Sequence, residues 1–124
     1  MNEILIYIGA GIIIVWGIAH IIPTRQIVKG FGEISADNKK VLAMEIVAEG
    51  LTLMFLGALP ILVSAIGDSQ SLTARIVFLT SGVMLLAMAI LTLATGAKTP
   101  VIWYKICPVV KTAVAVLYIF GGTL

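Results

Sequence analysis

The sequence has few charges and almost none of the residues that usually carry catalysis or bind metals. Asp, Glu, Lys and Arg make up 11% of its 124 residues, against about 25% in a soluble domain. Cysteine and histidine each occur once, as Cys107 and His20. A single chain therefore forms no internal disulfide, no C-x-x-C pair and no complete metal or bis-histidine haem site from these residues. These absences leave a small redox enzyme subunit as the least supported function.

Long apolar runs are abundant in the sequence. Hydrophobic residues make up 60% of the chain and form four blocks, each of the ~20 residues that a helix needs to cross a bilayer. Backbone groups in lipid must hydrogen-bond within their own segment, so each block is predicted to be a helix. We predict an all-α membrane protein, a single domain over residues 1–124, in which a four-helix bundle is formed by helices at about 4–22, 38–64, 72–95 and 100–122.

The basic residues indicate an orientation. They concentrate in and beside the first and third connections: Arg25, Lys29, Lys39, Lys40, Lys98 and Lys105. By the positive-inside rule these connections face the cytoplasm and both termini lie on the outer side, which predicts a prokaryotic inner membrane. The net charge of +2 is too small to suggest nucleic acid. Membrane lipids are the expected partners, because a basic inner surface favours anionic headgroups.

The first connection is long enough to hold structure of its own. Pro23 ends the preceding helix, and two interpretations of the segment after it stay open: a short interfacial helix ending near Gly30 or Gly32, or an ordinary loop. Ser35 or Asp37 is predicted to cap the second spanning helix.

The second apolar block carries two carboxylates, Glu45 and Glu49, which lie four residues apart and therefore on one face of a helix. An ionisable group inside a spanning helix costs on the order of 3 kcal/mol on insertion scales. At the helical rise, Glu49 and Lys111 lie ~12 Å and ~15 Å from the start of their apolar blocks. We predict that they pair, because pairing offsets much of the cost of burying either charge alone.

Two further residues complete the predicted ligand-binding site. His20, near the inner end of the first helix, is predicted to hydrogen-bond to Glu45 at the mouth of the same cavity, and Tyr104 shares a helical stripe with Lys111. The site is then His20, Glu45, Glu49, Tyr104 and Lys111. A structural alternative stays open for each: Glu45 reaching the headgroups, Tyr104 in the aromatic belt, His20 merely hydrogen-bonded, and Glu49 with Lys111 as a purely structural pair.

Small residues indicate close helix packing. Gly50 and Gly57 in the second block permit a neighbouring helix to approach, and Pro60 removes one backbone hydrogen bond. The third helix is predicted to be scaffold whose hydroxyls bond back to their own helix. A homo-oligomer, or a place in a larger membrane complex, is expected because three glycines of the first block offer association faces: Gly9, Gly11 and Gly17.

Three phrases carry a resemblance to a known family: GAGIIIVWGIAHIIP, VKGFGEIS and EIVAEGLTLMFLGALPIL. Together they resemble the DoxX-like four-helix membrane proteins, whose second helix typically carries a Glu, then Gly and a Leu-rich stretch ending in Gly. The likeness covers the first half by motif and the whole chain by helix count. It implies that Glu49 is the family-like acidic position, in a small membrane subunit that in some members accompanies a quinone-linked sulfur oxidoreductase or redox stress. The fourth helix matches no part of that pattern.

Two functions are the leading hypotheses. The first is an accessory or binding subunit, without catalytic activity of its own, that holds a quinone or a lipid in the inner-half polar pocket. The alternative is a proton-coupled small-molecule transporter that exchanges a proton on Glu49 for a cationic substrate. In size it resembles the small multidrug resistance exporters, but those carry their essential Glu in the first helix, where this chain has only Glu3.

Overall fold

The computed structural model of the protein describes residues 3–123. The elements, in order, are α1 (Glu3–Ile21), α2 (Thr24–Lys29), α3 (Ala36–Ile66), α4 (Leu72–Ala94), the short 3-10 helix η1 (Gly96–Lys98) and α5 (Ile102–Thr123). Four of these helices are long and apolar enough to cross a membrane. The prediction of an all-α integral membrane protein with four spanning helices is confirmed, and the observed helix ends lie within two residues of the predicted ones.

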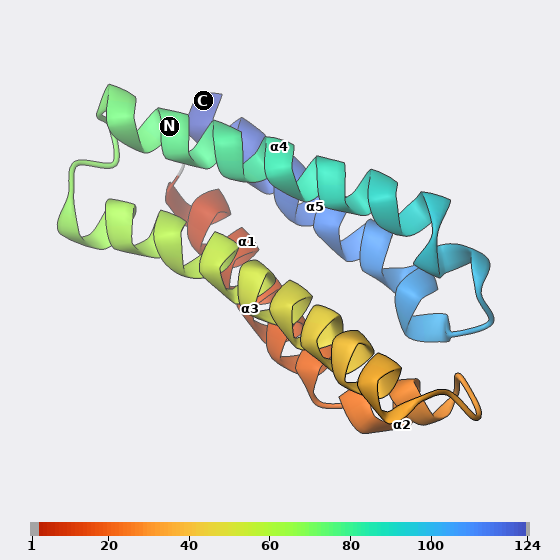
Figure 1. Cartoon of the computed structure of the whole chain (residues 1–124). Coiled ribbons are helices and arrows are strands. Elements are labelled where there is room, and N and C mark those ends of the chain that lie inside the picture. Colours follow the sequence, from red (N-terminus) through yellow and green to blue (C-terminus); the bar gives the residue numbers. More distant parts are fainter. Residues whose placement is uncertain (1–2, 124) are drawn as a thin grey trace.

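The spanning helices are arranged as two pairs (Figure 1). α1 lies along α3, α4 lies along α5, and α1 also packs on α5, whereas α3 and α4 touch each other much less. The turn between α3 and α4 lies at the same end of the bundle as the two chain termini, and α2 and η1 lie at the other. We call the end with the chain termini the terminal end and the opposite one the α2 end.

Helices α1 and α3 are in contact through their backbones. A Cβ added to Gly50 would lie 2.9 Å from the carbonyl oxygen of Gly17, and one added to Gly57 would lie 2.8 Å from that of Ala10. The two contacts are spaced seven residues apart on both helices, so small residues recur on the touching faces. Without a hydrophobic drive between helices in lipid, such close approach is a main source of packing energy, and the predicted role of Gly50 and Gly57 is confirmed.

Two of the three glycines expected to mediate self-association are used inside the bundle instead. A Cβ on Gly9 would meet the ring of Tyr118 at 3.0 Å, and one on Gly17 would meet the carbonyl oxygen of Gly50 at 2.8 Å. An added Cβ at Gly11 would meet no described atom within 4 Å. The expectation is therefore wrong for Gly9 and Gly17, because α3 and α5 already cover them.

The core at the terminal end contains a hydrogen bond that a proline makes necessary. α3 continues through Pro60, which has no N–H, so the carbonyl of Leu56 lacks its usual partner four residues on. The hydroxyl of Tyr118 on α5 donates to that carbonyl oxygen at 2.9 Å, and the Tyr118 side chain is completely buried. α5 thus supplies the donor that α3 lacks. Around them pack Ile6, Ala10, Ile13, Leu53, Ala74, Phe78, Leu85, Val114 and Ala115.

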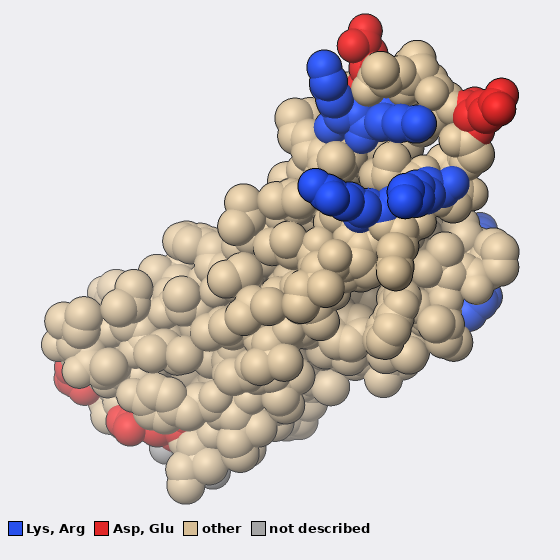
Figure 2. All heavy atoms as spheres, turned by 90° about the horizontal axis from the view of Figure 1, so that it is seen from below, with Lys and Arg blue, Asp and Glu red and all other residues tan. Residues whose placement is uncertain are grey.

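At the α2 end, the first connection folds into a short helix rather than a plain loop. α2 closes at Gly30, whose N–H donates to the carbonyl oxygens of Gln26 and Ile27 at 3.1 Å. Gly32 comes next but one with φ of 77°, a conformation that favours glycine. Ser35 then caps α3 by accepting from the N–H of Asn38 at 3.1 Å, so Ser35 and not Asp37 is the cap. Lys and Arg side chains gather at one end of the face drawn in Figure 2.

Candidate functional site

All four spanning helices contribute to one buried polar cluster. Lys111 of α5 is completely buried, and its ammonium donates to Oε1 of Glu49 on α3 and to Oγ1 of Thr92 on α4, the latter at 3.0 Å. His20 of α1 places Nε2 2.8 Å from Oε2 of the same Glu49, at ion-pair distance but without the alignment of a hydrogen bond. One carboxylate therefore faces two basic groups, and the predicted pairing of Glu49 with Lys111 is confirmed.

Local packing explains why these residues meet. His20 lies about one turn beyond Gly17 on α1, and Glu49 directly precedes Gly50 on α3, so both lie beside one of the two close backbone contacts between these helices. Thr92 lies in the last turn of α4, where its hydroxyl donates to the carbonyl oxygen of Met88 at 2.9 Å. The oxygen keeps its lone pairs free to accept from Lys111. The cluster thus depends on the close contact between α1 and α3 and on the Thr92 hydroxyl of α4.

The structure corrects one predicted contact. His20 lies against Glu49 and not against Glu45, because the glycine contact holds His20 level with Glu49, one turn further along α3 than Glu45. Glu45 is exposed and has no ion-pair partner among residues 3–123. The rings of Tyr104 and His20 pack in a T-shaped arrangement, with centroids 5.9 Å apart.

Three residues in or beside the cluster were not in the predicted site. Thr92 was missed because hydroxyls in spanning helices usually bond back to their own helix, as Thr80 and Thr95 do here. The indole N–H of Trp16 donates to Sγ of the buried Cys107 at 3.2 Å. The spacing in the sequence could have predicted this second contact, because Trp16 lies four residues before His20 and Cys107 four residues before Lys111.

The cluster reaches a cavity of about 580 Å³ between α3 and α4, which we call the α3–α4 groove. Its polar lining includes Glu45, Glu49, Thr52 and Tyr104, and its apolar lining includes Met84 and Met88. The side chain of Glu49 is 29% exposed and that of Lys111 is 0% exposed. Lys111 therefore lies behind Glu49, and neither Lys111 nor His20 is among the residues that line the groove. Their contact with a ligand stays a prediction.

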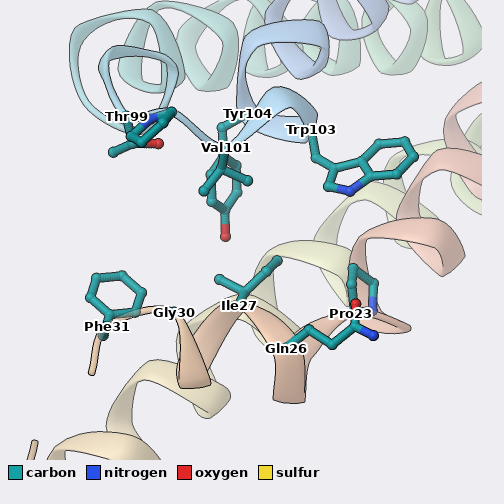
Figure 3. A pocket seen from close by; sticks show the side chains of 10 residues that line it. Pro23, Gln26, Ile27, Gly30, Phe31, Thr99, Val101, Trp103 and Tyr104 are labelled. Carbon is teal, nitrogen blue, oxygen red and sulfur yellow. The ribbon is translucent and has the colours of Figure 1, made fainter. Parts of the chain in front are cut away.

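A second cavity, of about 410 Å³, lies between α2 and the start of α5 (Figure 3). Ile27 and Phe31 line it from the side of α2, and Val101 and Trp103 line it from the side of α5. Figure 3 shows the hydroxyl of Tyr104 pointing toward Ile27. Tyr104 also lines the α3–α4 groove, so it is shared by the two cavities.

No protein-family model, curated protein or solved structure matches the chain. The resemblance to DoxX-like proteins accordingly stays a prediction that rests on the quoted phrases. Among residues 3–123, no group of three or more His, Cys, Asp or Glu side chains is placed to hold a metal ion. The functional interpretation therefore rests on the geometry of the cluster and the groove.

Proposed function

We propose that the protein is a small membrane binding subunit that holds an amphipathic molecule, a quinone or a lipid, in the α3–α4 groove. The observation that carries this proposal is the position of Glu49, where charges buried among four helices open into a largely apolar groove. Small-molecule sites of ~300–1,000 Å³ with an apolar lining and a few polar groups are typical of ligand binding. Ionisable residues facing a cavity in the membrane are a functional hypothesis by default.

The lining indicates how such a ligand lies. Its polar end meets the carboxylates of Glu49 and Glu45, which accept hydrogen bonds, beside the ring of Tyr104. A quinol hydroxyl or a lipid hydroxyl or amine suits these carboxylates as a hydrogen-bond donor. Lys111 compensates the charge of Glu49 and fixes its position. The tail would run along Met84 and Met88.

The test is ligand occupancy in protein extracted gently from its own membrane. We expect quinone or lipid, identified by mass spectrometry, to copurify with the wild type and to be reduced in Glu49→Gln and in Ala48→Trp. Ala48 lines the groove without taking part in the cluster, so a bulky side chain there fills the groove and leaves the charges paired. Lys105→Met, an exposed lysine on α5, is the control. Unchanged occupancy in both groove variants contradicts the proposal.

The alternative proposal is a proton-coupled transporter that uses Glu49. Two observations favour it: the carboxylates of Glu45 and Glu49 face one groove, which suits a cation, and His20 offers a second proton site behind Glu49. The ammonium of Lys111 beside Glu49 counts against it, because that charge repels cations. Proton flux into liposomes should be lost in Glu49→Gln, and flux that persists in this variant excludes the mechanism.

We also propose that both termini face outward across a prokaryotic inner membrane. The support is the basic α2 end, which carries six of the eight Lys and Arg residues. Alkaline phosphatase fused to the C-terminus should be active, and green fluorescent protein fused there and exported unfolded should stay dark. The reverse pattern overturns the orientation.

An accessory role implies partners, either further copies of the chain or a larger membrane complex. Exposed Gly11 and the apolar outer faces of the helices are the surfaces available for such contacts. Native mass spectrometry of gently extracted protein should show an oligomer or a bound partner protein. A bare monomer without ligand would contradict the accessory role.

A further inference from the structure

A groove at the α2 end combines basic side chains from two helices. It lies between α2 and the first turns of α3, has a volume of about 410 Å³, and contains Arg25 and Lys29 from one side and Lys39 and Lys40 from the other. We call it the basic groove. It shares no lining residue with the α3–α4 groove.

The four basic side chains of the basic groove form no ion pair within the described part of the chain. The ion pairs of residues 3–123 join Glu49 to His20 and to Lys111, and none involves the four basic residues of the groove. Arg25 and Lys29 lie four residues apart on α2, a spacing at which like charges destabilise a helix. All four are exposed. An anion bound between the two helices would relieve this repulsion.

The position of the basic groove indicates where that anion comes from. Lys40 directly precedes Val41, where the apolar run of α3 begins, so the groove lies at the membrane boundary. Val28 and Ala43 supply apolar lining. Next to it Met44 of α3 is 57% exposed. The surface therefore offers cations for a headgroup and an apolar path for the chain attached to it.

We infer that the basic groove binds the phosphate of an anionic phospholipid headgroup. The planar guanidinium of Arg25 offers two parallel N–H donors to phosphate oxygens, and the three lysines act as point charges around them. Clusters of Lys and Arg immediately beside a spanning helix are typical of sites that recognise anionic lipids. The acyl chains lie on the apolar face that begins at Val41.

The experiment titrates delipidated protein in an uncharged detergent with dioctanoyl phosphatidylglycerol, and follows binding by native mass spectrometry. We expect saturable binding to the wild type and much weaker binding of dioctanoyl phosphatidylcholine. Lys29→Gln/Lys40→Gln should weaken phosphatidylglycerol binding by about thirtyfold, given the usual contribution of each basic residue near an anionic lipid. Lys98→Gln/Lys105→Gln removes the same charge outside the groove and should bind within about twofold of the wild type.

Three results would overturn the inference. The first is equal loss in the two double variants, which indicates a diffuse surface effect rather than a site. The second is equal binding of the zwitterionic and anionic lipids. The third is displacement of the lipid by inorganic phosphate at matched concentration, which would identify a soluble phosphate compound as the ligand. Circular dichroism of each variant verifies that these exposed substitutions leave the helices folded.

Discussion

The two ends of the bundle are built from the same four helices but differ in the contacts that hold these helices and in what the helices enclose. At the terminal end the helices are held by apolar packing, by the contact of Gly57 with Ala10 and by the hydrogen bond from Tyr118 to Leu56. Toward the α2 end they enclose Glu49 and Lys111, and the cavities open there. Apolar side chains gain little from associating in lipid, so close packing between α1 and α3 holds these helices together along their length. Space for the groove remains between α3 and α4, which touch each other much less.

The comparison teaches where stability and function are separable. The buried residues of the terminal end contact only other residues of the bundle, so substitutions of them should change folding and leave any ligand specificity unchanged. Glu49 has both roles, since it holds Lys111 and faces the α3–α4 groove. Glu45, one turn away on the same helix, faces the groove but takes no part in the buried cluster. Substitutions at four places test this division.

Breaking the terminal end should have the largest effect. In Gly57→Leu the new side chain meets the Ala10 carbonyl oxygen and Ile14 at distances under 3 Å, so α1 and α3 must separate. We expect a loss of at least about 3 kcal/mol, or no folded protein at all, because overpacking and lost backbone contact add. Gly11→Leu is the matched control, with open space around it. Similar thermal unfolding of the two variants would contradict the packing described.

Breaking the buried pair should come next. Lys111→Met removes the buried ammonium partner of Glu49 and leaves it facing His20 alone, and removing one partner of a buried pair typically costs about 3–5 kcal/mol. Glu49→Gln/Lys111→Met should be more stable than Lys111→Met alone, because the double variant leaves no unpaired carboxylate. Thermal unfolding in detergent measures both. If the two substitutions simply add, the pair is not coupled as the structure shows.

The hydrogen bond that compensates for Pro60 should have an intermediate effect. Tyr118→Phe leaves the buried Leu56 carbonyl without a donor, which costs about 1–3 kcal/mol. Pro60→Ala restores the N–H that α3 lacks, so Tyr118→Phe should cost clearly less in a Pro60→Ala background. A double-mutant cycle of thermal stabilities checks this. If Tyr118→Phe costs the same stability in both backgrounds, the Tyr118 hydroxyl does not replace the N–H that Pro60 lacks.

The smallest change in stability is expected at Glu45. Because Glu45 is exposed and unpaired in the described chain, Glu45→Gln should stay within about 0.5 kcal/mol of the wild type. Glu49→Gln, the same substitution one turn further, should destabilise the protein because it leaves Lys111 buried without its carboxylate. Comparable stability of the two variants would mean that the cluster adds nothing to folding.

Much of the fold was predictable because the bilayer restricts it. Length and hydropathy were enough to place four helices, since lipid leaves the backbone no other partners. The distance of each residue from the start of its apolar block was enough to pair Glu49 with Lys111, because the helical rise per residue gives both distances. Gly50 and Gly57 were recognised as contact points from size alone. Each of these inferences needs only local geometry and the thickness of the membrane.

The remaining details depend on how the helices are placed beside one another. Nothing in the sequence shows that the Gly17 and Gly50 contact brings His20 to Glu49 instead of Glu45, or that Thr92 of the supposed scaffold helix accepts from Lys111. The rotation and offset of neighbouring helices decide these contacts, and both depend on tertiary packing. The class of protein and the depth of its charges therefore follow from length, hydropathy and helical rise along the chain. Which charge faces another side chain and which faces a groove follows from the packing of the helices against one another.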